Sequence, residues 1–191
     1  MRRAAWDEGW WGAARRIVSP NVDFRPKGVA VSLAVVHSIS LPPGEYAGDA
    51  IERLFTNRLD CSAHPYFGQL RDVRVSAHFV VRRHGRLLQF VSCGRRAWHA
   101  GRSEWNAREN CNDYSIGIEL EGLEGEAFDP VQYRILSRLL RALCRRYPIE
   151  AVVGHEHVAV GRKHDPGCRF DWMRLARSSG CGSLRYPFAA R

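Results

Sequence analysis

The chain has 191 residues, of which 29 are basic and 20 acidic, so its formal net charge is +9. A composition of 45% hydrophobic and 26% charged residues is typical of a globular domain and excludes disordered, collagen-like and disulfide-stapled chains. The longest apolar run, Val29–Val36, is far shorter than the roughly 18 residues that a membrane helix needs. No apolar segment follows the basic residues at positions 2 and 3, so we expect no export signal, no membrane segment and a cytoplasmic protein.

The basic charge is almost entirely arginine. Lys27 and Lys163 are the only lysines, and the other 27 basic residues are arginines scattered along the chain. The positive charge favours an anionic partner, but this scatter argues against nucleic acid. Lysine can lose its proton after a modest change of environment and arginine cannot, so Lys163 is a candidate for acid–base or point-charge work. The six cysteines form no C-x-x-C pair, and we expect them to be reduced.

The first half of the chain reads as an irregular arm over residues 1–28, followed by a buried strand over Val29–Val36 that ends at His37. A short helix is expected over 49–56. Two strands are expected over 76–83 and 86–91, joined by a two-residue turn at His84-Gly85.

The second half begins with a strand over 114–121, in which apolar residues alternate with polar ones and with Gly117. A glycine on that polar face predicts the close approach of another group. A helix is expected over 130–147, capped by Asp129, and then a strand over 149–153 that ends at Gly154-His155. These elements predict a single α/β domain over 29–177 with a mixed sheet flanked by helices, and a loosely ordered tail over 178–191.

Two of the apolar strands end in a histidine, His37 and His155. Two histidines and one nearby acid are the ligand set of a catalytic zinc ion, which leaves one position for water. The acid could be Glu156 or Asp165, the latter fixed on a turn by the Pro-Gly that follows it. His157 could chelate together with His155 if both lie on an extended strand, and His164 is a further alternative.

Glu119 lies in the middle of the strand 114–121, on its polar face. A carboxyl group shielded from water there would have a raised pKa, which suits a general base. For Glu121, on the same face, we expect a solvated position.

Six segments in order resemble the type 2 amidase family, which includes phage lysozyme-type amidases and peptidoglycan recognition proteins. They are Val35–Gly44, Val75–His78, Arg96–Gly101, Cys111–Gly122, Gly154-His155 and Arg162–Gly167. The likeness covers nearly the whole chain, from about Gly9 to Trp172, and it is strongest to the cytosolic members that recycle cell wall. It implies the α/β fold of that family, the peptidoglycan recognition protein-like fold.

The resemblance implies one zinc ion per chain, held by His37, His155 and Asp165. It makes Glu119 the base that activates water and Lys163 the group that stabilises the oxyanion. The family reaction cleaves the amide between the lactyl group of N-acetylmuramic acid and the first L-alanine of the stem peptide. The recycling members act on 1,6-anhydro-muropeptides, and their loss lets activator muropeptides accumulate in bacteria with an inducible β-lactamase.

The stem peptide carries carboxylates, and by resemblance Arg74 and Arg108 are candidates to bind them, with Trp98 packing near the sugar or peptide. Each of these three is equally well read as a surface arginine or a core tryptophan. Ser38 and Asn110 stand where relatives often carry Asn and Arg, which puts the preference for the peptide end in question. The alternative function is a non-catalytic muropeptide receptor on the same fold. A monomer is expected, although no sequence feature fixes the oligomeric state.

Overall fold

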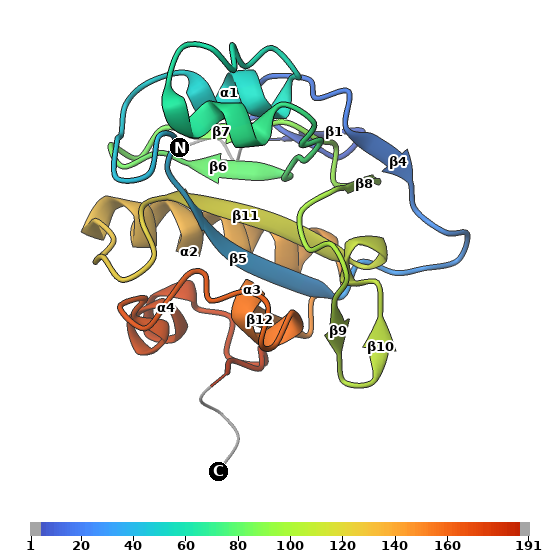
Figure 1. Cartoon of the computed structure of the whole chain (residues 1–191). Coiled ribbons are helices and arrows are strands. Elements are labelled where there is room, and N and C mark those ends of the chain that lie inside the picture. Colours follow the sequence, from blue (N-terminus) through green and yellow to red (C-terminus); the bar gives the residue numbers. More distant parts are fainter. Residues whose placement is uncertain (1–4, 188–191) are drawn as a thin grey trace.

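The computed structural model describes residues 5–187, and its centre is a six-stranded sheet (Figure 1). In spatial order the strands are β12 (Ala151–Gly154), β5 (Leu33–Ile39), β11 (Ser115–Glu121), β6 (Phe79–Val81), β7 (Leu87–Gln89) and β3 (Arg15–Arg16). Neighbouring strands are parallel except β6 and β7, which pair antiparallel. The mixed sheet expected from the sequence is confirmed.

Shorter elements surround this sheet. Among residues 5–187 the paired short strands are β1 (Trp6–Asp7) with β2 (Trp10–Trp11), β4 (Val22–Phe24) with β8 (Arg95–Ala97), and β9 (Glu104–Trp105) with β10 (Arg108–Glu109). The α-helices of the same part of the chain are α1 (Ala50–Phe55), α2 (Pro130–Arg146), α3 (His155–Val158) and α4 (Trp172–Ser179). Short 3₁₀ helices span Pro65–Leu70 and Cys111–Asp113.

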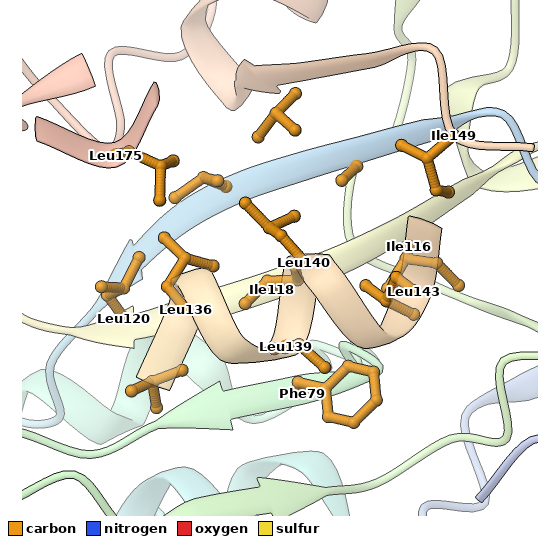
Figure 2. Packing of buried hydrophobic residues seen from close by; sticks show 14 of the residues in the cluster. Phe79, Ile116, Ile118, Leu120, Leu136, Leu139, Leu140, Leu143, Ile149 and Leu175 are labelled. Carbon is orange, nitrogen blue, oxygen red and sulfur yellow. The ribbon is translucent and has the colours of Figure 1, made fainter. Parts of the chain in front are cut away.

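Helix α2 covers one face of the sheet, running along β5 and β11 (Figure 1). It begins at Pro130 as predicted, and the Gln132 side chain accepts a hydrogen bond from the Asp129 N–H at 3.0 Å. Its leucine stripe is fully buried against the apolar face of β11, and Figure 2 shows the two sets of side chains packed together. Each such leucine contributes about 2 kcal/mol through burial, so this interface is the main core of the molecule.

Strand β11 is a central strand of the sheet, and every one of its residues is buried. Ile116, Ile118 and Leu120 join the α2 core, as the alternation predicted. The opposite face carries the polar residues, so both faces of this strand are covered, as is usual in parallel sheets. That second face builds the site described below.

Strand β5 lies later in the sequence than the apolar run indicated. It spans Leu33–Ile39 rather than Val29–Val36, because its parallel pairing with β11 continues to the partners Ile39 and Glu121. His37 therefore lies inside the strand and is the register partner of Glu119. The sheet register, not the end of an apolar run, fixes where this histidine sits.

The β6–β7 hairpin has a longer connection than predicted. The N–H of Arg82 donates to the carbonyl of Arg86, and the N–H of Gly85 donates to the carbonyl of Arg82. Three residues, Arg83 to Gly85, therefore form the turn instead of two. Gly85 has φ +78°, the left-handed conformation that ends such three-residue turns and that glycine adopts without strain.

Both flanking segments pack on the sheet where the structure describes them. Strand β3 of the N-terminal arm extends the sheet, and Arg25 donates hydrogen bonds to the carbonyls of Asp113 and Ser115. At the other end, Arg185 exchanges backbone hydrogen bonds with the β12 edge and Leu184 is buried. The predicted tail residues 188–191 lie outside the described part, and the domain limits 29 and 177 stay predictions.

Candidate metal centre

Two histidines and one aspartate meet at the carboxyl ends of the central strands. Strand β12 ends at Gly154, which is the register partner of Val36, so His155 follows directly beside His37 on β5. Asp165 comes from the loop after α3, where its carbonyl accepts a hydrogen bond from the N–H of Glu156 at 2.9 Å. The ligand atoms of His37, His155 and Asp165 all lie within 4.8 Å of one another.

The distances within this triad match those between ligands of one metal ion. The Nδ1 atoms of His37 and His155 each lie 3.2 Å from a carboxylate oxygen of Asp165. Two ligands bonded to one tetrahedral zinc-sized ion at about 2.0–2.1 Å would be separated by roughly 3.3 Å. The distances therefore suit a divalent cation between these three side chains.

The hydrogen bonds of His155 fix which of its two nitrogen atoms faces the site. Its Nε2 lies 3.1 Å from the carbonyl oxygen of Ala100, which only accepts, so Nε2 carries the proton. Nδ1 is then the nitrogen that faces the carboxylate of Asp165, at 3.2 Å. A divalent cation held between them would take this nitrogen and the carboxylate as ligands.

The charge states are those that metal binding needs. Burial lowers the pKa of His37 to about 4, although its hydrogen bond with Asp165 acts in the opposite direction, so this imidazole is neutral at pH 7. Burial acts to raise the pKa of Asp165, but the hydrogen bonds with His155 and His37 outweigh it and hold the pKa below its ordinary value. Neutral imidazole and ionised carboxylate are the ligating forms.

Glu119 lies beside the triad, across the β5–β11 pair from His37. Its side chain is 8% exposed, and its Oε2 atom has no hydrogen-bond partner within residues 5–187. Burial, and then the charge of Asp165, raise the pKa of Glu119 well above its ordinary value, while Lys163 acts against them. A shielded carboxyl with a raised pKa is the form of a general base that acts near neutral pH.

The triad and Glu119 open into one pocket of about 470 Å³. Lys163 and Trp98 line the same pocket, so these two predicted residues lie at the site. Lys163 is exposed on the loop that leads to Asp165, and the Trp98 indole N–H donates to Asp23 at 2.7 Å. An apolar wall that includes Leu41 and Val75 completes the pocket.

Arg74 and Arg108 do not line this pocket. Arg74 is exposed and donates to the carbonyls of Arg71 and Val73. Arg108 lies on β10, with its guanidinium 3.9 Å from the centre of the Tyr114 ring. Their proposed roles in binding the peptide stay predictions.

The alternative ligands are not part of the triad. His155 begins helix α3 instead of continuing a strand, so His157 is turned away and its Nδ1 accepts the N–H of Gly154 at 3.0 Å. His164 is exposed on the pocket rim, and Glu156 is half-buried outside the cluster. Of the two acids that spacing left open, Asp165 meets the histidines.

The expectation of a solvated Glu121 is wrong. Its side chain is 2% exposed and forms an ion pair with Arg82 at 3.0 Å. It also accepts hydrogen bonds from the N–H groups of Ala47 and Arg83. These partners come from two loops that cover the polar face of β11, which local alternation could not reveal.

His99 is a buried residue of the site, and the sequence analysis assigned it no role. Its Nδ1 lies 2.9 Å from Nε2 of His37, and its Nε2 lies 3.0 Å from Oγ of Ser115. Burial, and then the neighbouring His37, lower the pKa of His99 well below its ordinary value. The sequence feature that pointed to this contact was Gly117, for which the close approach of another group was predicted. That group is the His99 imidazole, because a Cβ atom at position 117 would lie 2.4 Å from the ring.

A larger cleft of about 870 Å³ lies next to the β9–β10 hairpin, lined by Trp105 and Val160 among others. It contains neither Glu119 nor any residue of the triad, and it shares only Arg162 with the smaller pocket. The reactive groups therefore belong to the 470 Å³ pocket in spite of its smaller size.

Comparison with known proteins gives the class of enzyme that this fold and site define. A family model described as N-acetylmuramoyl-L-alanine amidase matches residues 27–168. The chain belongs to this amidase family, and its fold is the single-domain α/β fold of the type 2 amidases.

Individual amidases are similar to this chain over most of its length. The chain is 51% identical over 171 residues to the 1,6-anhydro-N-acetylmuramyl-L-alanine amidase AmpD of Citrobacter freundii, covering 88% of this chain and 91% of that protein. A crystal structure of a selenomethionine derivative of AmpD superposes with a TM-score of 0.88 at 48% identity, covering 91% of this chain and 98% of the other. The amidase AmiD of Escherichia coli, solved with an anhydro-N-acetylmuramic acid peptide substrate, has a TM-score of 0.60 at 29% identity, covering 87% of this chain and 64% of that one.

No helix within residues 5–187 combines the length and the apolar character that crossing a membrane requires.

Proposed function

We propose that this amidase hydrolyses the amide between 1,6-anhydro-N-acetylmuramic acid and the L-alanine of the stem peptide, with one Zn²⁺ per chain, in cytosolic recycling of cell-wall fragments. The observation that carries the proposal is the buried, unpartnered carboxyl oxygen of Glu119 beside the triad of His37, His155 and Asp165. The substrate is assigned by analogy with the relative of 51% identity, which is named for this activity.

The donor set favours zinc over other divalent ions. Two imidazoles and one carboxylate, with distances that suit tetrahedral bonding, are typical of catalytic zinc, whereas Mg²⁺ and Ca²⁺ prefer oxygen ligands. Zinc bound here would supply a Lewis acid that polarises the scissile carbonyl and makes water acidic enough to react near pH 7.

Glu119 acts as the proton carrier in this proposal. Its carboxylate takes a proton from the attacking water and then gives it to the nitrogen of the departing L-alanine. The raised pKa supports the first step, because it makes this carboxylate a stronger base than a solvated glutamate. Its seat inside β11 keeps the carboxyl fixed next to the triad.

Lys163 supports the developing negative charge on the carbonyl oxygen. Lys163 lines the pocket, and its charge affects the pKa values of both Glu119 and His37. A fixed cation at an oxyanion typically contributes a few kcal/mol to the rate. Trp98, tied to Asp23, offers a flat apolar surface for the sugar or the peptide.

Metal content and turnover test this function together. Purified protein is expected to contain about one zinc per chain and to release anhydro sugar and peptide from a 1,6-anhydro-muropeptide. Chelation should abolish the reaction and added Zn²⁺ should restore it. A muropeptide with a reducing sugar and intact peptidoglycan serve as comparison substrates. Full activity after exhaustive chelation would contradict the zinc proposal, and binding without turnover would favour the receptor alternative.

Lys163→Arg tests the role of the lysine. The variant keeps the positive charge, but its planar head group cannot reproduce the compact ammonium, so kcat is expected to fall while zinc content stays at the parental level. Lys27→Arg, the same substitution at the other lysine, which is exposed and does not line the pocket, is the control. Parental kcat in Lys163→Arg would remove the lysine from the mechanism.

A further inference from the structure

Two consecutive residues, His99 and Ala100, contact the outer nitrogen atoms of both histidines of the triad. The His99 ring meets His37 at a distance of 2.9 Å between Nδ1 and Nε2. The carbonyl oxygen of Ala100 meets Nε2 of His155 at 3.1 Å. A single stretch of backbone between β8 and the Cys111–Asp113 turn therefore touches both imidazoles on the side away from Asp165.

These contacts fix which nitrogen of each histidine is free for a metal. The Ala100 carbonyl holds the proton of His155 on Nε2, which leaves Nδ1 open. When Nδ1 of His37 also acts as a ligand, Nε2 of His37 carries a proton and donates a hydrogen bond to Nδ1 of His99. His99 then carries its own proton on Nε2 and donates to Oγ of Ser115 at 3.0 Å.

The stretch itself is rigidly held. The side-chain oxygen of Asn112, which is 6% exposed, accepts the N–H of His99 at 3.1 Å and the N–H of Ala100 at 2.9 Å. The His99 ring rests on Gly117, where a Cβ atom would lie 2.4 Å away. Neither the backbone nor the ring can shift without breaking one of these contacts.

We propose that His99 and Ala100, held by Asn112, are the positioning pair that orients both metal-binding imidazoles, with His99 acting through His37. This inference rests on the proposed zinc function and adds a set of supporting residues to it. Outer hydrogen bonds of this kind fix the orientation and basicity of a ligand, and their loss typically lowers metal affinity about 10- to 100-fold. Asn112 is a positioning residue for the same reason.

Zinc affinity of two His99 variants is the test, measured by competition with a chromophoric chelator. His99→Leu fills the space but accepts no hydrogen bond, and it is expected to bind Zn²⁺ about 10- to 100-fold more weakly. His99→Asn is smaller but keeps an acceptor oxygen near the position of Nδ1, and it should stay within about threefold of the parent. If His99 only filled space, the order of the two variants would be reversed, and that result would overturn the proposal.

His78→Leu is the matched control. His78 is also fully buried, with its ring 5.9 Å from that of His99, but its nitrogen atoms contact the Gly117 N–H, the Arg95 carbonyl and the Arg25 guanidinium and touch no residue of the triad. Its zinc affinity is expected to stay near the parental value after correction for the folded fraction. An equal loss of affinity in His78→Leu and His99→Leu would overturn the proposal.

Imidazole NMR of the zinc-loaded protein gives a second measurement. His99 should carry its proton on Nε2, and the Nε2 proton of His37 should exchange slowly with water in the parent and in His99→Asn. A proton on Nδ1 of His99 would overturn the proposal. If neither His99 variant folds, Ser115→Ala decides, because it removes only the acceptor for His99; unchanged exchange at His37 and unchanged affinity would then count against the proposal.

Failure of this inference and failure of the proposed function give different results. A parent protein that binds zinc and cleaves the substrate, next to a His99→Leu variant with parental zinc affinity, would overturn the positioning role alone. A parent protein that binds no zinc would overturn both.

Discussion

Glu119 and Glu121 are two residues apart on the same face of β11, and both are buried, with 8% and 2% of their surfaces exposed. Their surroundings differ. Glu121 is paired with Arg82 and accepts two backbone N–H groups, so its charge is compensated. Glu119 keeps one oxygen without a partner within residues 5–187 and lines the site pocket.

The comparison teaches that partners, rather than burial, separate a structural carboxylate from a reactive one. An uncompensated buried carboxyl destabilises a fold, and it stays protonated to a higher pH than a paired one. Residues with such environments cluster where chemistry takes place. We therefore expect substitutions at the two positions to affect different properties, and the predictions below test that separation.

Glu119→Gln should have the largest effect, and it should be on the rate. The amide keeps the size of the side chain but cannot take a proton, so kcat is expected to fall about 10²- to 10⁴-fold. Zinc content and the free energy of unfolding should not decrease, because the uncompensated carboxyl is removed. Steady-state kinetics, metal analysis and urea unfolding on one preparation check all three quantities. Normal turnover by this variant would show that Glu119 is not the base.

Glu121→Gln should have the converse effect. Loss of the charge leaves the buried Arg82 with Glu52 as its one ionic partner among residues 5–187, and a broken buried pair typically costs about 3 kcal/mol. The free energy of unfolding should fall by that amount, while kcat of the folded fraction stays close to the parental value. A rate loss as large as that of Glu119→Gln, in folded protein, would erase the distinction between the two carboxylates.

The pH dependence of stability should separate the two positions in metal-free protein. The folded pKa of Glu119 is raised above the ordinary value of 4.5, so the folded state holds this proton more tightly than the unfolded chain. Its contribution to stability is fully present below pH 4.5 and is lost as the pH rises from there through the raised pKa, by up to about 1.4 kcal/mol per pH unit.

Urea unfolding of the parent and Glu119→Gln across this pH range measures the contribution. The stability difference between the two proteins should shift in favour of the glutamine variant as the pH rises. Glu121→Gln is the control, because its difference from the parent should not follow that trend. A difference between the parent and Glu119→Gln that is constant with pH would mean that the pKa of Glu119 is not raised.

The sequence predicted those parts of the molecule that local periodicity controls. The alternation of Ile116, Ile118 and Leu120 and the leucine stripe of α2 both depend on neighbours along one element, and both are confirmed. The metal residues could be proposed from their types and from a family resemblance, because spacing alone left Glu156 and His157 open. The three predicted metal ligands, His37, His155 and Asp165, meet in space, and Glu119 and Lys163 line the same pocket.

Features that depend on distant partners could not be predicted in the same way. The burial of Glu121 comes from Arg82 and from the Ala47 loop, neither of which is a neighbour in sequence. His99 gave no local signal of its own, and only Gly117 indicated that some group would rest on it. The limits of β5 were misjudged because pairing with β11 extends the strand beyond its apolar residues.

The smallest predicted effect concerns the other face of β11. Ile118 is fully buried in the α2 core, and Ile118→Val removes one methylene group without changing the shape of the strand. The free energy of unfolding should fall by about 1 kcal/mol, with kcat and zinc affinity unchanged. Thermal unfolding and the kinetic assay on the same sample check this. Because Ile118 precedes Glu119 directly, a change in kcat at constant zinc content would show that packing on the apolar face adjusts the position of the carboxyl group, and the two faces would then not be independent.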